Sequence, residues 1–464
     1  MTNVDDVYSQ VPESSESSPN LHTVLIATDA HAASLSVADY LEKIGYNVDI
    51  AVYDGETLNV STNIEPNAVL CYFSDALEDL PLICKAIRAR YSKRMPPLIG
   101  AVSEEGAVDS ELFDSVIFPP AHHSQIANRV NSMVRLQEME VEIALRVATL
   151  SESFGLTTDL KDSMASIRYR ILFIGKASPE FMVIINALQK RNVEVVAAFT
   201  SFSAFDYLHE HSFDAVVMNA LEGNEPALTI GETMRRNSKL YHVPTLFLVN
   251  EDSFTDHELA FERGARDIIS ARSPEPEISG RILELANYHR IHTQLKKEFS
   301  GLGGDTCLDI PSGVFNAAFF KAHMARVCKY NTSRNTNVSV LTLGLTHLAG
   351  PDVPKINIER AYAQIGNMIK NLVRMHDIVA RLETDLYVIA FAGLPMQLTN
   401  SIRDRVMGIV ECAGFESGHP DIKSFTVGMQ SQISTLRLNE DSDLFIQRAQ
   451  DALKIEMFPV DKSA

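Results

Sequence analysis

Two successive stretches of the chain repeat the same alternation of short apolar runs and amphipathic segments. In the first stretch the apolar runs occupy residues 22–29, 46–53, 66–73, 96–103 and 114–120. In the second stretch the corresponding runs occupy residues 170–176, 193–199, 213–220, 243–249 and 266–271. Short apolar runs separated by helical segments are typical of strands buried on both faces of an open parallel sheet. The matching length and order of the two stretches also indicate an internal duplication.

The last third of the chain has a different pattern. After the Gly-rich segment 300–306 come a helix, a strand at 338–345, another helix, and two strands that form a hairpin within 373–393. A further helix, a strand at 423–430 and a C-terminal helix follow. This order predicts a mixed α+β sheet and not a third parallel unit. The charged amphipathic stretch 134–150 is expected to be a helix that connects the first two units.

Composition limits the classes of function. The formal net charge of −19 argues against sequence-independent binding to DNA, RNA or an anionic membrane. No apolar run approaches the ~18 residues of a membrane span, and no signal-peptide pattern is present, so we expect a cytoplasmic protein without membrane insertion. The cysteines are scattered and form no C-x-x-C pair, which predicts reduced thiols.

Charged residues stand at both ends of the first hairpin strand. Arg374 and Asp377 precede this strand at Arg-x-x-Asp spacing, and after the five residues IVARL the turn reads Glu383-Thr384-Asp385-Leu386-Tyr387. The planar fork of an arginine suits the O6 and N7 edge of guanine, and a carboxylate accepts hydrogen bonds from the guanine N1–H and exocyclic amine. Such a pair is also commonly a solvated salt bridge without function.

From about His22 to Val460, the chain resembles the receiver–receiver–GGDEF family of the PleD type. The third domain of that family condenses GTP into cyclic di-GMP at a Gly-Gly-Asp/Glu-Glu-Phe turn, and an Arg-x-x-Asp motif before the turn binds the product. The resemblance implies an α/β fold class, with two tandem flavodoxin-like receiver domains followed by an α+β GGDEF domain. It also implies that cyclic di-GMP binds at Arg374, Asp377 and, on the next helix, Arg405.

The turn and its surroundings depart from the family pattern. Glu383 and Thr384 replace glycines that let the backbone approach phosphates closely. Leu386 replaces an acid, and Gly344 stands where the family has a metal-binding aspartate, so no side-chain oxygen is offered to Mg²⁺ there. Asp385 alone retains a carboxylate. Because phosphoryl transfer depends on metal and positioned charge, we expect no cyclase activity and no bound metal.

The two receiver-like units lack the usual acceptor of a phosphoryl group. Alignment with the family places Tyr72 and Asn219 at the acceptor positions, where a working receiver has an aspartate. We therefore expect both units to be non-phosphorylatable docking modules. A shifted acceptor at Asp54 or Asp75 in the first unit is the alternative.

Within this family the chain is similar to effectors that bind cyclic di-GMP without making it. This similarity implies recruitment to the cell pole, with an RcdA-type adaptor, the ClpXP protease and a CtrA-type regulator as partners in cell-cycle proteolysis. A homodimer is compatible with it. The alternatives are an active or residual diguanylate cyclase and a receiver-type scaffold that binds no nucleotide. We also expect Arg374 to lie at the surface, so that its replacement leaves the fold intact.

The predicted domain bounds follow from these patterns. They are a disordered N-terminus at 1–20, a first degenerate receiver at 21–132, a helical connector at 133–167, a second degenerate receiver at 168–293, a linker at 294–308 and a degenerate GGDEF domain at 309–464.

Overall fold

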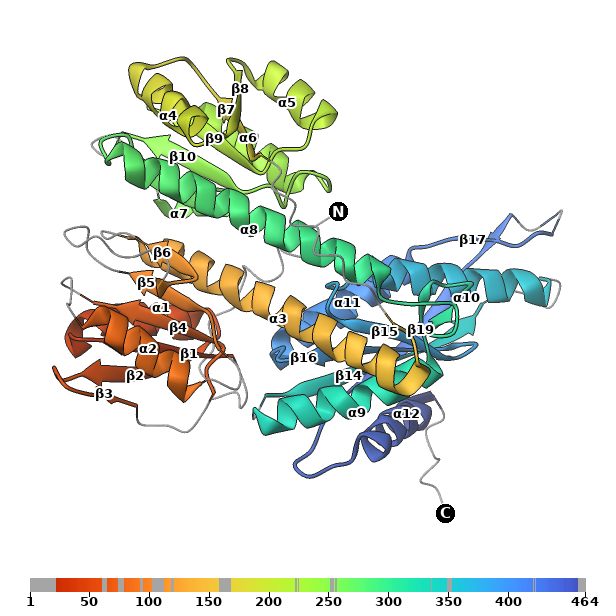
Figure 1. The fold of residues 1–464 in the computed structure, drawn as a ribbon. Coiled ribbons are helices and arrows are strands. Elements are labelled where there is room, and N and C mark those ends of the chain that lie inside the picture. Colours follow the sequence, from red (N-terminus) through yellow and green to blue (C-terminus); the bar gives the residue numbers. More distant parts are fainter. Residues whose placement is uncertain are drawn as a thin grey trace.

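The structure is a computed structural model, and Figure 1 shows its three α/β units. It describes residues 22–60, 65–73, 79–91, 95–101, 112–117, 121–157, 168–221, 223, 225–250, 254, 257–334, 336–348, 353–419, 421 and 423–457. The predicted N-terminus 1–20 and the alternative acceptor Asp75 lie outside these ranges. Among the helices within them, none is both long and apolar enough to span a bilayer.

The first unit is a six-stranded sheet in the order β3-β2-β1-β4-β5-β6. Its strands are β1 (Thr23–Thr28), β2 (Asn47–Tyr53), β3 (Leu58–Asn59), β4 (Ala68–Tyr72), β5 (Leu98–Ala101) and β6 (Ser115–Ile117). Apart from the antiparallel edge strand β3, all neighbours pair in parallel. Helix α1 (His31–Lys43) and helix α3 (His123–Phe154) cover one face, and α2 (Leu80–Arg90) covers the other.

The second unit repeats this arrangement. Its strands are β7 (Arg170–Ile174), β8 (Glu194–Ala198), β9 (Ala215–Ala220), β10 (Thr245–Val249) and β11 (Asp267–Ser270). They are all parallel, in the order β8-β7-β9-β10-β11. Its helices are α4 (Pro179–Lys190), α5 (Ser201–Glu210), α6 (Glu225–Arg236), α7 (His257–Glu262) and α8 (Glu275–Gly301). When the antiparallel edge strand β3 is left out, the parallel strands of the first unit follow the order β2-β1-β4-β5-β6, and those of the second unit follow β8-β7-β9-β10-β11. Numbered along the chain within each unit, both are the 2-1-3-4-5 order of flavodoxin-like folds, which confirms the two predicted parallel sheets.

The third unit is a mixed sheet in the order β12-β13-β15-β16-β14-β19. Its strands are β12 (Leu308–Asp309), β13 (Val314–Asn316), β14 (Val338–His347), β15 (Ile378–Glu383), β16 (Leu386–Ala392) and β19 (Val427–Thr435), beside the small pair β17 (Phe415–Glu416) and β18 (Ser424–Phe425). Only β13 and β15 pair in parallel. Helices α9 (Ala317–Ser333) and α12 (Ser442–Met457) cover one face, and α10 (Lys355–Lys370) and α11 (Met396–Glu411) the other.

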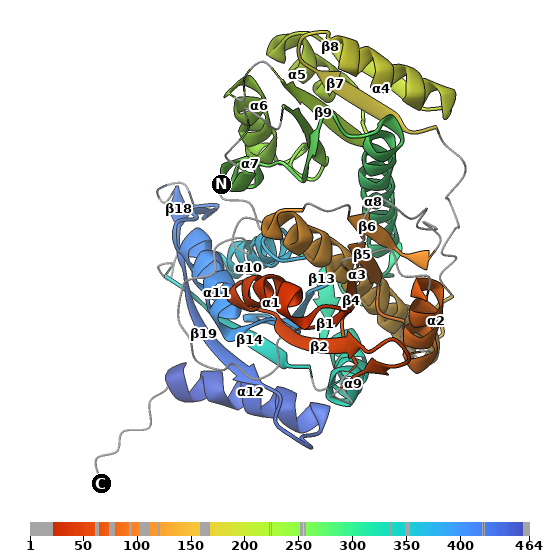
Figure 2. The same cartoon turned by 90° about the vertical axis from the view of Figure 1, so that its left-hand side faces the viewer.

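The long helices α3 and α8 link the units. Both views show each of them running from its own parallel sheet toward the third unit (Figures 1 and 2). The predicted bounds at 132/133 and 293/294 fall inside these helices. Each helix therefore serves both as the last helix of its sheet and as the connection to the third unit.

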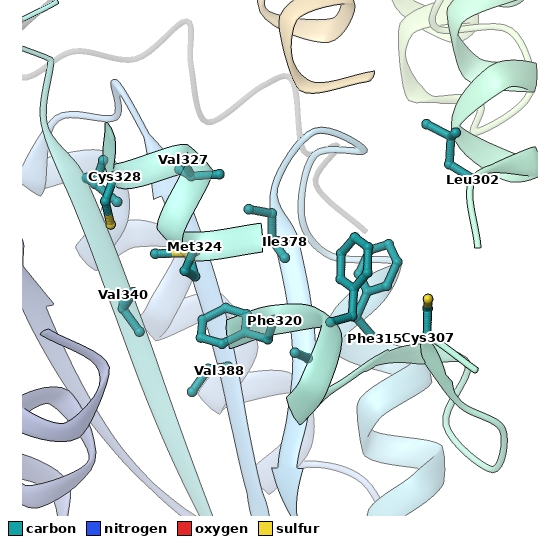
Figure 3. Packing of buried hydrophobic residues seen from close by; sticks show 14 of the residues in the cluster. Leu302, Cys307, Phe315, Phe320, Met324, Val327, Cys328, Val340, Ile378 and Val388 are labelled. Carbon is teal, nitrogen blue, oxygen red and sulfur yellow. The ribbon is translucent and has the colours of Figure 1, made fainter. Parts of the chain in front are cut away.

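The C-terminal half of α3 shares a hydrophobic core with α8 and the third unit. Figure 3 shows part of this core, with labels on Leu302 after α8 and on third-unit residues such as Phe320 and Ile378. From α3 this cluster buries Leu136, Met139, Ile143 and Leu150. Burying an aliphatic side chain stabilises by about 1.5–3 kcal/mol, so these four together contribute on the order of 10 kcal/mol. Ile378, which directly follows Asp377, belongs to the same cluster. The loop before β15 is thus anchored next to α3.

Candidate functional site

The loop from 371 to 377 joins α10 to β15 and forms a closed turn. The main-chain N–H of Arg374 donates to the Asp377 carboxylate at 2.8 Å. The N–H of Asp377 donates in return to the Arg374 carbonyl at 3.1 Å. Asp377 therefore has a structural role, because an aspartate that accepts from a nearby backbone N–H stabilises a turn.

Arg405 reaches the same loop from helix α11. Its guanidinium donates to the main-chain carbonyl of Leu372, which is 33 residues away in sequence. Arg405 and the turn formed by Arg374 and Asp377 therefore meet at one loop. The three residues predicted to bind the ligand are brought to the same place.

Helix α3 packs against this loop through a stripe of charged residues. Glu138, Glu142 and Arg146 follow one another at four-residue spacing, which places them on one face of the helix. The Arg146 guanidinium donates to the carbonyl oxygens of residues 375 and 377, each at 3.2 Å. A Glu138 carboxylate oxygen lies 4.0 Å from Arg374 Nη1. The loop is therefore held by side chains from the helix that ends the first unit.

The expectation that Arg374 lies at the surface holds only in part, because other segments of the chain cover the loop. Asp377 is only 8% exposed, and the side chain of Arg374 is 19% exposed. Helix α3 covers the loop through Arg146 and Glu138, and Glu138 in turn pairs with His22, which precedes β1. The His22 ring packs so closely on Gly393 that no Cβ would fit there. Neither α3 nor His22 belongs to the hairpin, so the hairpin sequence gave no sign of this burial.

Burial changes the proton affinities of the acids at the site. It raises the pKa of the Asp377 carboxyl to about 7, although the nearby Arg374 charge acts in the opposite direction. Burial also acts to raise the pKa of Glu138, but its contacts with His22 and Arg374 prevail and hold that pKa at about 2. At neutral pH Glu138 is therefore an anion, whereas Asp377 titrates in the physiological range.

The predicted hairpin is confirmed, since β15 and β16 pair antiparallel. Leu386 lies opposite Gly344 of β14 and is only 8% exposed, so it packs into the sheet. The next residue, Tyr387, is fully buried and donates from its hydroxyl to the Tyr362 carbonyl at 2.8 Å. At the register of Gly344 and Leu386 the two strands present no side-chain oxygen. The carboxylates of Glu383 and Asp385 remain at the turn itself.

A cavity of about 970 Å³ lies beside the hairpin turn. Its lining residues are Asp309, Pro311, Ile356, Glu359, Arg360, Ala363, Gln364, Asn367, Met368, Arg381, Leu382, Glu383 and Thr384. Arg381 pairs with Asp309 at 3.2 Å and also donates to the Thr384 carbonyl. None of the three predicted ligand-binding residues lines this cavity. The cavity therefore lies at the turn end of β15, whereas the 371–377 loop that contacts α3 lies at the other end of this strand.

The two predicted acceptor positions lie at corresponding places in the parallel sheets. Tyr72 ends β4 beside Thr28 of β1, and Asn219 lies near the end of β9. In a 2-1-3-4-5 sheet this is the point where the strand order reverses and ligands bind. The Asn219 amide donates to the Lys176 carbonyl at 2.8 Å, and its Cβ lies 2.7 Å from the place of a Cβ on Gly175. The neutral amide of Asn219 thus occupies the position where a phosphoryl acceptor was predicted to be missing in the second unit.

No group of three or more His, Cys, Asp or Glu side chains within the described ranges is placed to hold a metal ion. The metal-free character of the chain stays a prediction.

Sequence reasoning missed the contribution of α3. Glu138 and Arg146 were part of a stretch recognised only as a charged connecting helix. Together with Glu142 they are spaced four residues apart, and this spacing indicates that all three lie on one polar face of the helix. What that face contacts depends on chain segments more than 200 residues away, since the Arg146–Asp377 contact spans 231 residues.

The chain was compared with known families and proteins. No family model matches it, and no curated protein matches it.

Among solved structures, the chain is similar to the GGDEF domain of DgcB from Caulobacter crescentus in complex with c-di-GMP, at 13% identity and a TM-score of 0.28, covering 33% of this chain and 89% of that chain. It is also similar to the FimX GGDEF domain from Pseudomonas aeruginosa at 14% identity and a TM-score of 0.29, and the match covers 32% of this chain and 91% of that chain. A putative response regulator from Chloroflexus aurantiacus matches at 17% identity and a TM-score of 0.25, and the match covers 26% of this chain and 99% of that chain. Similarities at this level assign no function to the chain.

Proposed function

We propose that this protein is a catalytically inactive effector that binds cyclic di-GMP at Arg374, Asp377 and Arg405. The observation that carries the proposal is the meeting of these residues at one loop, with Arg405 reaching the Leu372 carbonyl from α11. An arginine fork, a carboxylate and a second arginine together match a guanine base that carries phosphates.

The chemistry of the hairpin turn supports the inactive state. Mg²⁺ needs hard oxygen ligands, and the facing positions Gly344 and Leu386 offer none from their side chains. The remaining acids, Glu383 and Asp385, add negative charge where a triphosphate would have to approach. Catalysis of phosphoryl transfer by metal and positioned charge has little basis in such a turn.

The two parallel units are proposed to be degenerate receivers that dock partners. Asn219 supports this, because its amide is engaged with the Lys176 carbonyl and an amide does not accept a phosphoryl group as an aspartate does. By resemblance to PopA, an effector of this architecture, the partners would be an RcdA-type adaptor, the ClpXP protease and a CtrA-type regulator, met in the cytoplasm at the cell pole. Self-association as a homodimer belongs to the same proposal.

Two assays on the full chain test the proposal. Incubation with GTP and Mg²⁺ should yield no cyclic di-GMP, whereas calorimetric titration with cyclic di-GMP should show saturable binding. Synthesis of the dinucleotide would refute the inactive state and favour a residual cyclase.

A nucleotide-independent scaffold is the second candidate. It is favoured by the contacts that Arg374 and Asp377 already make within the protein, with Glu138 and with the turn itself. If cyclic di-GMP binds neither to the wild-type protein nor to a variant in which the Glu138 charge is removed, the scaffold is the better account.

A further inference from the structure

An anionic side chain already lies beside Arg374 in the proposed ligand site. The Glu138 carboxylate lies 2.6 Å from His22 Nε2, 3.7 Å from His376 Nε2 and 4.0 Å from Arg374 Nη1. Its own side chain is only 18% exposed. A carboxylate held among these nitrogens occupies the kind of position that a phosphate of a bound ligand would take.

We propose that Glu138 is an internal competitor of the ligand's phosphate for Arg374, so that ligand binding releases the 371–377 loop from Glu138. This inference rests on the proposed binding of cyclic di-GMP at Arg374. Two anions do not share one guanidinium without repulsion, and the arginine fork binds a phosphate in the same way as a carboxylate. The ligand therefore has to displace the Glu138 contact before it gains its own.

The exchange is local and leaves α3 in place. The C-terminal half of this helix is buried in the core shared with α8 and the third unit. Separating that core would cost about as much as a ligand of micromolar affinity can supply, whereas one partly exposed ion pair costs little to break. Arg146 contacts only carbonyl oxygens of the loop, so these bonds survive when Arg374 turns toward the ligand.

His22 connects this exchange to the first unit. It immediately precedes β1, pairs with Glu138, and accepts at its carbonyl a hydrogen bond from the Asn47 N–H at 2.9 Å, where β2 begins. A Glu138 side chain released from Arg374 keeps His22 as a partner and moves with it. The state of the ligand site is therefore communicated to the start of the neighbouring strands β1 and β2 of the first sheet.

The test compares cyclic di-GMP affinity in single variants of the full chain. Glu138→Gln keeps the size of the side chain and removes its charge, so Kd should tighten about three- to tenfold. Glu138→Asp keeps the charge and retracts it by one methylene, so its Kd should lie between the two; it also serves if the glutamine variant does not fold. Glu140→Gln is the matched control, because it removes an equal charge from an exposed position on the same helix.

Each outcome decides one of the two proposals. Tighter binding by Glu138→Gln but not by Glu140→Gln supports the competition. If the wild type binds and Glu138→Gln binds equally or more weakly, the competition is refuted while the ligand site stands. The competition is also refuted if both glutamine variants gain equally, since the effect would then be one of net charge. Absence of binding in all of these proteins refutes the ligand site, and the competition with it.

Discussion

The guanidinium of Arg146 donates to the main-chain carbonyl of Asp377 across 3.2 Å, and so joins α3 to the loop before β15. Because the carbonyl is the acceptor, the Asp377 carboxylate is not used by this contact. Arg146 is itself held by Glu142 at 2.6 Å and lies over the rings of Phe299 and Phe315. This contact thus fixes the position of the loop without engaging the Asp377 carboxylate.

Replacing Arg146 with alanine should destabilise the protein. Glu142 is buried and would lose a charged partner, keeping only His323 at 3.0 Å, and such a loss costs about 3–5 kcal/mol. Chemical denaturation should show this as a lower transition midpoint. Arg326→Ala is the control, because its pair with Glu152 is exposed and should contribute less than about 1 kcal/mol. Equal shifts in the two variants would contradict the bracing role of Arg146.

Affinity for cyclic di-GMP should depend on pH through Asp377. The guanine N1–H and amine need an ionised carboxylate as acceptor, and burial raises the pKa of this acid to about 7 in the free protein. Protons therefore compete with the ligand below pH 7, and Kd should tighten by about tenfold between pH 6 and pH 8. Titrations across this range provide the measurement. Asp377→Asn should bind more weakly with a flatter profile, and an unchanged pH dependence in that variant would point to another group.

The receiver-like units should remain unmodified by acetyl phosphate and Mg²⁺. Tyr72 and Asn219 stand at the acceptor positions, and the Asn219 amide is already engaged with a backbone carbonyl. Mass spectrometry of the intact protein should show no added phosphoryl group. An acid-labile adduct mapped to Asp54 or Asp75 would establish a shifted acceptor in the first unit.

The two parallel sheets could be predicted from the sequence because most of their strands are nearly continuous apolar runs. The buried strand β10, for example, is Thr245–Val249, and every residue in it is buried. The ends of the long helices could not be predicted in this way. Helix α8 continues to Gly301 although glycine costs a helix about 1 kcal/mol, because Phe299 and Leu302 are buried in the shared core. Tertiary packing outweighed the local signal.

The hairpin could be predicted from the sequence, whereas the surroundings of the candidate site could not. Motif spacing along the hairpin led to the prediction that Arg374 and Asp377 bind the ligand, which stays a prediction, and the hairpin itself formed as expected. Their contacts with Glu138 and Arg146 come from another part of the chain. Contacts between units depend on how whole sheets and helices pack, and no local periodicity encodes that.

The proposed contact between the Arg374 guanidinium and a guanine of cyclic di-GMP is the central claim. Arg374→Ala should weaken cyclic di-GMP binding about ten- to a hundredfold, which corresponds to about 1–3 kcal/mol for a bidentate arginine–guanine contact. Arg374→Lys should restore little, because lysine keeps the charge but not the planar fork. Circular dichroism should show that these proteins are folded, since Glu138 retains His22 as a partner when Arg374 is removed.

The most direct test is a calorimetric comparison of cyclic di-GMP binding by Arg374→Ala and by Glu383→Gln. Glu383 lines the cavity at the hairpin turn, at the opposite end of β15 from the Arg374 loop. We predict that Glu383→Gln binds cyclic di-GMP like the wild type, while Arg374→Ala loses at least tenfold in affinity for it. Wild-type affinity in Arg374→Ala, together with lost binding in Glu383→Gln, would contradict it and place the ligand in the cavity.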